Sequence, residues 1–210
     1  RYLHALDLGF DPDPTAHVIL THSTVPPTYT SHGDPIYTLG HIERVTRREY
    51  PDTIEATVNM LYRAEMWGNS ALVIDATGVG IPVVQQFKRH PRMVAAMERG
   101  GLILIPIMIT SGGGVTKKDG ALHVPKSVLV GVCHSILGQR RLRVPKALKE
   151  GATLMQEMKN FRAKFTESGN VTYAGREKTH DDILLATVLG LWVAETFRGT
   201  EAKVLRAAYS

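Results

Sequence analysis

Tyr2-Leu-His-Ala-Leu-Asp-Leu-Gly9 is an apolar run that carries a single carboxylate, Asp7. Such a run predicts a β-strand over residues 2–8, and the proline-rich segment after it predicts a turn. A second strand at 16–21 completes a hairpin, and a third at 36–44 gives three antiparallel strands. An ionised side chain within an apolar strand is unfavourable unless a positive charge meets it.

Two more acidic sites occur in apolar surroundings. Asp75 ends the apolar run of residues 71–75, and the pair Asp181-Asp182 opens a long apolar helix predicted for residues 181–198. No lysine or arginine adjoins Asp7, Asp75 or this pair along the chain. The compensating partner that the pattern indicates is a bound divalent cation.

The remaining elements follow in a mixed order. A helix capped by Asp52 is predicted to run to about Gly68, and Pro82 is placed in the first turn of another. The glycine-rich segment 111–120 predicts a mobile loop or a long hairpin. The other expected elements are a strand at 102–107, helices at 125–138 and 146–159, and short extended segments at 161–165 and 170–173.

Three antiparallel strands, a helix, a strand, a helix, a strand and then further helices are the order of the ribonuclease-H-like arrangement. The sequence therefore predicts one α/β domain over residues 1–210, with a mixed five-stranded central sheet flanked by helices and a β-hairpin or loop elaboration. Its 210 residues and 43% hydrophobic content suffice for one sizeable core. The single cysteine, Cys133, lies in an apolar run and is expected to be a packed core thiol.

In that arrangement the first and fourth strands are neighbours, so Asp7 and Asp75 are expected to point into the same space. The last helix is expected to bring Asp181 or Asp182 beside them. Carboxylates that converge in this way repel one another and are predicted to bind two Mg²⁺ or Mn²⁺ ions. We expect Asp7, Asp75 and Asp181 to be catalytic, with Asp7 shared between the ions. Asp182 is a further ligand, although one member of the pair is expected to be a helix cap.

Two more residues are auxiliary candidates. Asp13 follows Asp7 across the turn and extends the second metal site, but aspartate in a proline-rich segment is commonly a turn former. His180 is a candidate for positioning a phosphate or a water, and a lone histidine before a helix is more often structural. For Asp7 or Asp75 taken alone, a structural strand-end aspartate is the alternative.

Positive charge is concentrated in one third of the chain. Between residues 112 and 178 there are 13 lysines and arginines against 5 acids, whereas the whole chain has a net charge of +5. Such clustering indicates a polyphosphate-binding surface, and a solvated face of basic helices is the alternative. The expected DNA-binding residues are Lys117, Lys118, Lys126, Arg140, Arg141 and Arg143.

Four segments in the right order resemble the nuclease domain of the large terminase subunit of tailed double-stranded DNA bacteriophages. These are 5–16 around Asp7, Leu72-Val-Ile-Asp-Ala-Thr-Gly-Val-Gly80, Val124-Pro-Lys-Ser-Val-Leu129, and 180–192 beginning His-Asp-Asp. The resemblance implies that the acids at Asp7, Asp75, Asp181 and Asp182 bind metal. It implies a further ligand, in some members, at Asp13.

The resemblance also implies a function. That family cuts concatemeric viral double-stranded DNA during genome packaging, with little sequence dependence in headful-packaging members. The resemblance further implies that this chain is the C-terminal part of a longer protein whose N-terminal part is a packaging ATPase. No G-x-x-x-x-G-K-[ST] phosphate loop of such an ATPase occurs in this sequence. The implied partners are DNA, the ATPase domain, the small terminase subunit and the portal. The implied location is the cytoplasm of the infected bacterium, and no membrane or secretion signal is expected.

Three other classes remain as alternatives. A sugar-kinase or actin-type ATPase shares the sheet but requires a much longer chain. A Holliday-junction resolvase or transposase-like nuclease shares the fold and would prefer branched DNA. A non-catalytic nucleic-acid-binding domain would bind DNA without cutting it when Mn²⁺ is supplied.

Overall fold

β1 (Tyr2–Asp7), the strand that ends in Asp7, lies inside the central sheet rather than at its edge. The computed structural model describes residues 1–9, 12–23, 33–78, 80–160 and 181–198, together with the backbone of 162–165 and 171–174. The other strands are β2 (Thr15–Ser23), β3 (Ile36–Val45), β4 (Ser70–Asp75), β5 (Ile103–Thr110), β6 (Thr116–Lys118), β7 (Ala121–Pro125), β8 (Leu142–Arg143), β9 (Arg162–Phe165) and β10 (Val171–Ala174). The helices are α1 (Tyr50–Leu61), α2 (Gly80–Arg89), α3 (Pro91–Glu98), α4 (Lys126–Gly138), α5 (Gly151–Asn160) and α6 (Asp182–Thr196).

The main sheet is mixed and has eight strands in the order β6-β7-β5-β4-β1-β2-β3-β8. β1 pairs antiparallel with β2 and parallel with β4. The five predicted strands form its unbroken middle, β5-β4-β1-β2-β3. Three short strands extend the predicted sheet, β7 and β6 at one edge and β8 at the other. β9 and β10 form a separate two-stranded sheet.

The glycine-rich segment forms a hairpin, the second of the two predicted alternatives. β6 and β7 pair antiparallel, with Lys118 opposite Ala121. The two residues between them, Asp119 and Gly120, have φ values of 52° and 75°. Positive φ at both central residues is the requirement of the tight turn that matches the twist of β-strands, and Asp-Gly is a favoured pair for it.

Two helix starts differ from the prediction. α1 begins at Tyr50, so Asp52 lies in its first turn and does not cap it. α5 begins at Gly151 instead of Lys146. The five residues before Gly151 form turns instead, in which the Leu148 N–H bonds the Pro145 carbonyl and the Gly151 N–H bonds the Leu148 carbonyl. These short-range bonds occupy backbone groups that a helix beginning at Lys146 would need for its own hydrogen bonds.

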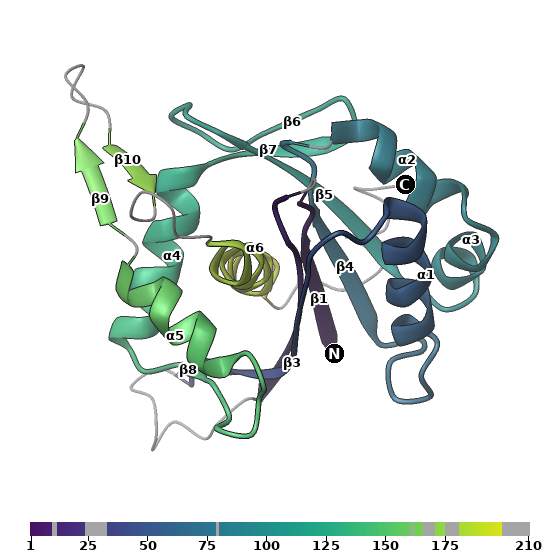
Figure 1. Cartoon of the computed structure of the whole chain (residues 1–210), viewed down its shortest axis with the longest axis horizontal. Helices are drawn as coiled ribbons and strands as arrows, with labels where there is room; N and C mark the ends of the chain where they lie inside the picture. Colours follow the sequence, from purple (N-terminus) through teal and green to yellow (C-terminus); the bar gives the residue numbers. More distant parts are fainter. Residues whose placement is uncertain are drawn as a thin grey trace.

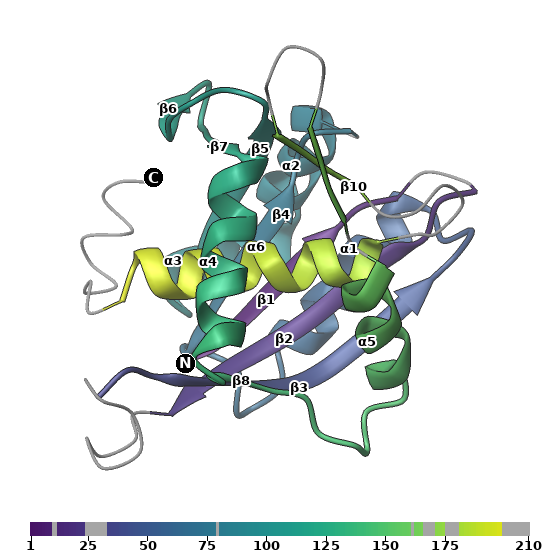
Figure 2. The same cartoon turned by 90° about the vertical axis from the view of Figure 1, so that its left-hand side faces the viewer.

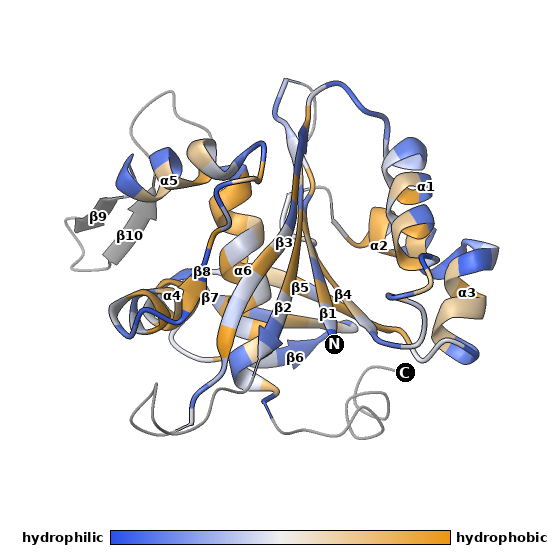
Figure 3. Cartoon of the chain, turned by 90° about the horizontal axis from the view of Figure 1, so that it is seen from below, coloured by the Kyte–Doolittle hydropathy of each residue, from blue (hydrophilic) through white to orange (hydrophobic). Residues whose placement is uncertain are grey.

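The helices form two layers, one on each face of the sheet (Figures 1 and 2). α1, α2 and α3 cover one face, and α4, α5 and α6 cover the other. Colouring the ribbon by hydropathy shows hydrophobic residues in the strands of the sheet and in α6 (Figure 3). α6 is buried almost all round because it lies between the sheet and helices α4 and α5.

A glycine permits the close approach of α6 to the sheet. A Cβ atom at Gly190 would come within 2.5 Å of a Leu20 methyl group and 3.4 Å of the Ala5 side chain. α6 therefore packs directly across β1 and β2, which sets where its N-terminus lies relative to Asp7. No helix in the described part of the chain is both long and apolar enough to cross a membrane.

Cys133 packs in the core, as predicted. It is 4% exposed on α4, and burial raises the pKa of its thiol to about 11. Because the thiolate is the reactive form, only about one thiol in a thousand is ionised at pH 8. We expect iodoacetamide to label Cys133 at pH 8 only as urea unfolds the protein, as measured by intact-mass spectrometry. Rapid labelling of the folded chain would contradict this placement.

Candidate metal centre

Asp7 and Asp75 lie side by side at the ends of adjacent parallel strands. β1 and β4 are in register, with Leu6 opposite Ile74, and each strand ends in its aspartate. Side chains alternate between the faces of a sheet, so Asp7 shares a face with Ala5, and Asp75 with Val73. Both of these apolar residues belong to the core beneath α6. The two carboxylates therefore project from the α6 side of the sheet.

The N-terminus of α6 adds the second pair of acids. Asp182 is the first residue of the helix and is 8% exposed. Asp181 occupies the capping position, but its side chain makes no capping hydrogen bond within the described structure. Burial raises the pKa of Asp7 well above its usual value, and the charges of Asp75, Asp182 and Asp181 raise it further. Four acids thus share one electrostatic environment.

Hydrogen bonds fix the orientation of Asp75. The backbone N–H of Thr77 donates to Asp75 Oδ1 at 2.8 Å. The Thr77 hydroxyl in turn accepts the Ile109 N–H at 2.8 Å, which ties this turn to β5. Burial raises the pKa of Asp75, whereas the Thr77 hydrogen bonds and the charge of Lys126 lower it. The carboxylate is therefore held in place before any ligand arrives.

Two basic residues reach the acids through the tertiary structure, although none adjoins them along the chain. The Arg44 guanidinium forms a salt bridge to Asp182 Oδ2 at 2.8 Å. Lys126, at the start of α4, lowers the pKa of both Asp7 and Asp75, and it lines a small pocket with Asp181. No salt bridge among the described residues joins an arginine or lysine to Asp7 or Asp75.

The four acids fit a divalent metal centre. They supply only carboxylate oxygens, the ligands that Mg²⁺ and Mn²⁺ prefer, and their mutual repulsion falls when a cation binds. No three of these aspartates have ligand atoms that all lie within 4.8 Å of one another. Among the described residues, only His17, His41 and Glu43 meet that distance. The aspartates are therefore spaced more widely than ligands gathered on a single ion. The charge of Asp182 raises the pKa of Asp7 more than the charge of Asp181 does. This difference favours Asp182 as the acid nearer to Asp7.

Comparison with known proteins gives matches in structure only. No family model matches the chain, and no curated protein sequence matches it. The large terminase nuclease from thermophilic phage G20c, with bound magnesium, is 19% identical. That alignment covers 90% of this chain and 79% of that one, with a TM-score of 0.61.

Two further structures agree. The large terminase nuclease domain of Thermus phage P74-26 is 18% identical over 95% of this chain and 81% of that one, with a TM-score of 0.57. The human cytomegalovirus terminase nuclease domain, soaked with manganese and bound to an inhibitor, is 9% identical over 91% and 83%, with a TM-score of 0.52. This chain has the ribonuclease-H-like fold of large terminase nuclease domains. The predicted fold class is confirmed.

Within this terminase-nuclease fold, sequence reasoning missed a fifth acid, Glu157 of α5, which is buried. Its Oε2 accepts the Leu184 N–H at 2.7 Å, and its Oε1 is buried with no hydrogen-bond partner in the described structure. Burial raises its pKa to about 7, the Leu184 bond and Arg44 lower it, and Asp182 and Asp181 raise it. Gly151, Leu154 and Glu157 form one buried stripe along α5, but the sequence alone does not show that this stripe packs inward.

Replacing Glu157 by glutamine is expected to stabilise the metal-free protein at pH 8. The folded-state pKa lies above the unfolded value, so the wild type loses stability as pH rises from about 4.5 to about 7. Glutamine keeps the Leu184 hydrogen bond and carries no charge. We expect a gain of about 1 to 2 kcal/mol at pH 8, allowing for solvent screening at the neighbouring aspartates, and almost none at pH 4.5.

Urea unfolding in EDTA at the two pH values measures this effect. Glu65→Gln, at an exposed acid in the turn after α1, serves as a surface control. An equal stabilisation at both pH values would contradict the prediction, because the gain would then not follow the ionisation of Glu157.

The auxiliary candidates receive no further support. Asp13 is exposed in the connection between β1 and β2, and its charge is not among those that shift the pKa of Asp7. His180 lies outside the described residues.

The expected basic residues divide into two groups in the terminase-nuclease fold. Lys117 and Lys118 are exposed on β6, close in the chain to Lys126. Arg140 and Arg143 are exposed near β8, at the opposite edge of the sheet. α4 connects the two groups and is about 20 Å long for its 13 residues.

Arg141 requires a correction, because it is buried and does not face solvent. It is 3% exposed, and its guanidinium bonds both oxygens of Glu195, at 2.9 and 3.2 Å, and the Pro35 carbonyl at 3.3 Å. A guanidinium engaged in this way is unavailable to a phosphate. We therefore leave Arg141 out of the proposed DNA-binding set.

Proposed function

We propose that this chain is a divalent-metal-dependent endonuclease that hydrolyses phosphodiester bonds of double-stranded DNA. The observation that carries the proposal is the gathering of Asp7, Asp75, Asp181 and Asp182 at the ends of β1, β4 and α6. Structural neighbours that are nucleases with bound magnesium or cobalt support it.

The site residues divide the chemistry among them. Asp7, on the central strand, would be shared by two ions, Asp75 would complete one site, and Asp182 with Asp181 would complete the other. Two ions held by these residues would supply an activated water and charge stabilisation for the departing 3′-oxygen. Lys126 attracts a phosphate to the entrance of the site, and Arg44 holds the carboxylate of Asp182 in place.

The same neighbours support a proposal for the biological setting. We propose that the chain cuts concatemeric viral DNA during packaging, in the cytoplasm of an infected bacterium, with little sequence dependence. Its partners would be a packaging ATPase domain, the small terminase subunit and the portal. The chain spans about four fifths of the terminase nucleases it matches, so the proposed activity concerns a nuclease unit.

Incubation of supercoiled plasmid with the purified protein tests the activity. Nicked and linear products are expected with Mn²⁺ or Mg²⁺ and none with EDTA. Equal cleavage in EDTA would exclude a metal-dependent reaction. Binding without cleavage in either metal would indicate a DNA-binding domain. A four-way junction cut much faster than linear duplex would favour a resolvase.

Removing the hairpin lysines is expected to weaken DNA binding and to make it less dependent on salt concentration. The variant Lys117→Gln/Lys118→Gln removes two exposed charges on β6. If each meets a phosphate, the slope of log affinity against log salt decreases in magnitude by about 1.8, or ~0.9 per contact. The matched control is Lys88→Gln/Arg89→Gln on α2. This helix lies on the face of the sheet away from the aspartates (Figure 1). Equal slopes for the two variants would refute the assignment of the hairpin.

A further inference from the structure

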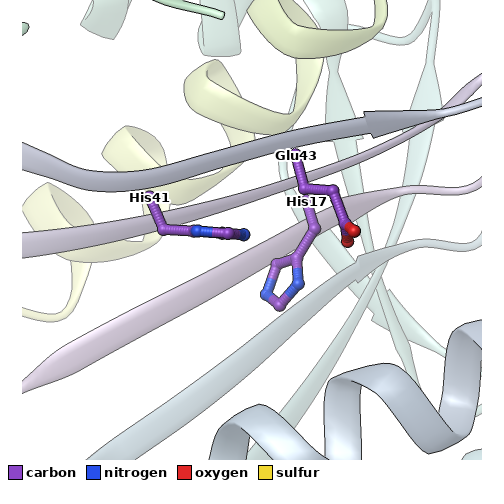
Figure 4. A group of neighbouring side chains, drawn as sticks. All are labelled: His17, His41 and Glu43. Carbon is purple, nitrogen blue, oxygen red and sulfur yellow. The ribbon is translucent and has the colours of Figure 1, made fainter. Parts of the chain in front are cut away.

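A second group of potential metal ligands lies on the face of the sheet away from the aspartates. His4 is three residues before Asp7 on β1 and therefore projects from the opposite face. Leu6, two residues after His4, shares that face. Leu6 lies opposite His17 on β2, and His17 lies opposite Glu43 on β3, so these side chains project from the same face. His41 lies two residues before Glu43, so it shares the same face. Figure 4 shows the side chains of His17, His41 and Glu43 gathered there.

These three side chains have the geometry of an ion site. One ligand atom from each of His17, His41 and Glu43 lies within 4.8 Å of the others. Small side-chain rotations therefore bring two nitrogens and a carboxylate oxygen to bonding distance of one ion, about 2.0 to 2.2 Å for zinc. His17 is 5% exposed, whereas His41 and Glu43 are half-buried, which leaves the site open to solvent on one side.

The hydrogen bonds around the group leave ligand atoms available. His17 Nε2 and His4 Nδ1 are 3.1 Å apart, which leaves His17 Nδ1 for another partner. His41 Nε2 is buried and has no hydrogen-bond partner in the described part of the chain. A buried imidazole nitrogen without a partner is unfavourable, and an ion would relieve this. Burial lowers the pKa of all three histidines, so each is neutral at pH 7, the form that binds metal.

Glu43 is held in the orientation that a ligand needs. Arg48 donates to both of its oxygens at 3.1 Å. Each oxygen retains a lone pair, and carboxylates that bind metals are commonly hydrogen-bonded in this way by a second residue. The contact of His17 with His4 would orient His17 in a similar way, because metal-binding histidines usually donate their other ring N–H to an acceptor.

We propose that His17, His41 and Glu43 bind one zinc-like divalent ion, with His4 orienting His17. Two imidazoles and one carboxylate suit Zn²⁺, Co²⁺ or Ni²⁺ better than Mg²⁺, which prefers oxygen ligands alone. Three protein ligands and an open side are the arrangement of a site that keeps a water as its fourth ligand. The ion would join β2 to β3 and is separate from the aspartate centre, which lies across the sheet.

The experiment uses untagged protein freed of metal with EDTA and then returned to chelator-free buffer. The background variant Asp7→Asn/Asp75→Asn removes two acids of the other centre, so the remaining binding reports the histidine site. We expect one Zn²⁺ or Co²⁺ per chain, a Co²⁺ visible spectrum of imidazole ligation, and a thermal midpoint raised by about 5–10 °C at a Zn²⁺ concentration 100-fold above Kd.

Two substitutions on this background identify the ligands. His41→Gln and Glu43→Gln are each expected to weaken Zn²⁺ binding by at least about tenfold, the lower bound for loss of a supporting residue. His134→Gln, an exposed histidine on α4, is expected to bind as the background does. Circular dichroism verifies folding, and both replaced side chains are half-buried at the sheet surface.

The proposal is overturned if the background variant binds no Zn²⁺, or if His41→Gln and Glu43→Gln bind it as tightly as the His134→Gln control. The histidines would then be a polar cluster packed on that face of the sheet. Since neither substitution touches an aspartate, this result leaves the proposed nuclease function untouched. Conversely, loss of DNA cleavage in the Asp7 variant says nothing against the histidine site.

Discussion

Asp7→Asn is expected to reduce Mg²⁺-dependent DNA cleavage by at least about 1000-fold. The residue ends the central strand, and its carboxylate interacts with all three other acids of the centre. If it bridges two ions, its loss disturbs both the attacking water and the departing oxygen. A thousandfold change corresponds to about 4 kcal/mol of transition-state stabilisation, within the range that metal-assisted catalysis supplies. Single-turnover cleavage of a linear duplex measures the rate.

The same substitution should stabilise the protein when no metal is bound. Burial and the charges of the neighbouring acids raise the pKa of Asp7, so its ionised form opposes folding near neutral pH. Asparagine has nearly the same shape and no charge. In EDTA at pH 8, Asp7→Asn is therefore expected to unfold at a higher temperature than the wild type, although it is inactive. Added Mn²⁺ should raise the wild-type midpoint more than that of the variant.

Asp52→Asn is the control for both measurements. Asp52 is exposed in the first turn of α1, on the other side of the sheet, so its substitution should alter neither cleavage nor the response to Mn²⁺. Cleavage at the wild-type rate by Asp7→Asn would show that the aspartates are not the active site. A variant that is inactive but clearly destabilised in EDTA would show that Asp7 is needed for the fold.

Arg141→Ala is expected to destabilise the protein by about 3 kcal/mol. Removing one partner of a buried ion pair typically costs about 3–5 kcal/mol, and Glu195 is about a quarter exposed, which places the estimate at the lower end. The Arg141 guanidinium anchors the end of α6 to β8, and the Tyr37 hydroxyl donates to the same carboxylate. Burial and this bond to Glu195 raise the pKa of Tyr37 beyond its usual range.

Urea unfolding compares Arg141→Ala with Arg140→Ala, its exposed neighbour, for which a change within about 0.5 kcal/mol is expected. The double variant Arg141→Met/Glu195→Gln should recover part of the loss, since it leaves no buried charge without a partner. If Arg141→Ala is as stable as Arg140→Ala but binds DNA more weakly, the side chain serves as a phosphate contact after all.

Local pattern sufficed for most of the fold. β1 and β4 follow from short apolar runs, and a hairpin in the glycine-rich segment was one of two predicted alternatives. The start of α5 did not follow from pattern, because turn hydrogen bonds between Pro145 and Gly151 compete with a helix that the composition would also allow. β6 and β8 were missed because runs of two or three residues carry no alternation to detect.

For the candidate site, the acids themselves were predictable and their partners were not. A carboxylate in an apolar run is visible in any sequence, because it conflicts with its neighbours. Arg44 and Glu157 lie in strands and helices that read as ordinary amphipathic segments, and only burial against α6 makes them part of the centre. Arg141 was misassigned because a basic cluster in the sequence does not reveal which of its members faces inward.

The amino-acid order alone therefore determined the five main strands, most of the helices and the four aspartates set among apolar residues, since these are local properties of a few neighbouring side chains. Only the tertiary structure decided that Asp182 meets Arg44, that Glu195 meets Arg141, and that the Leu184 N–H meets Glu157. These partners are 138, 54 and 27 residues apart. Contacts at such separations depend on which faces of the sheet and helices pack together, and no local periodicity specifies that choice.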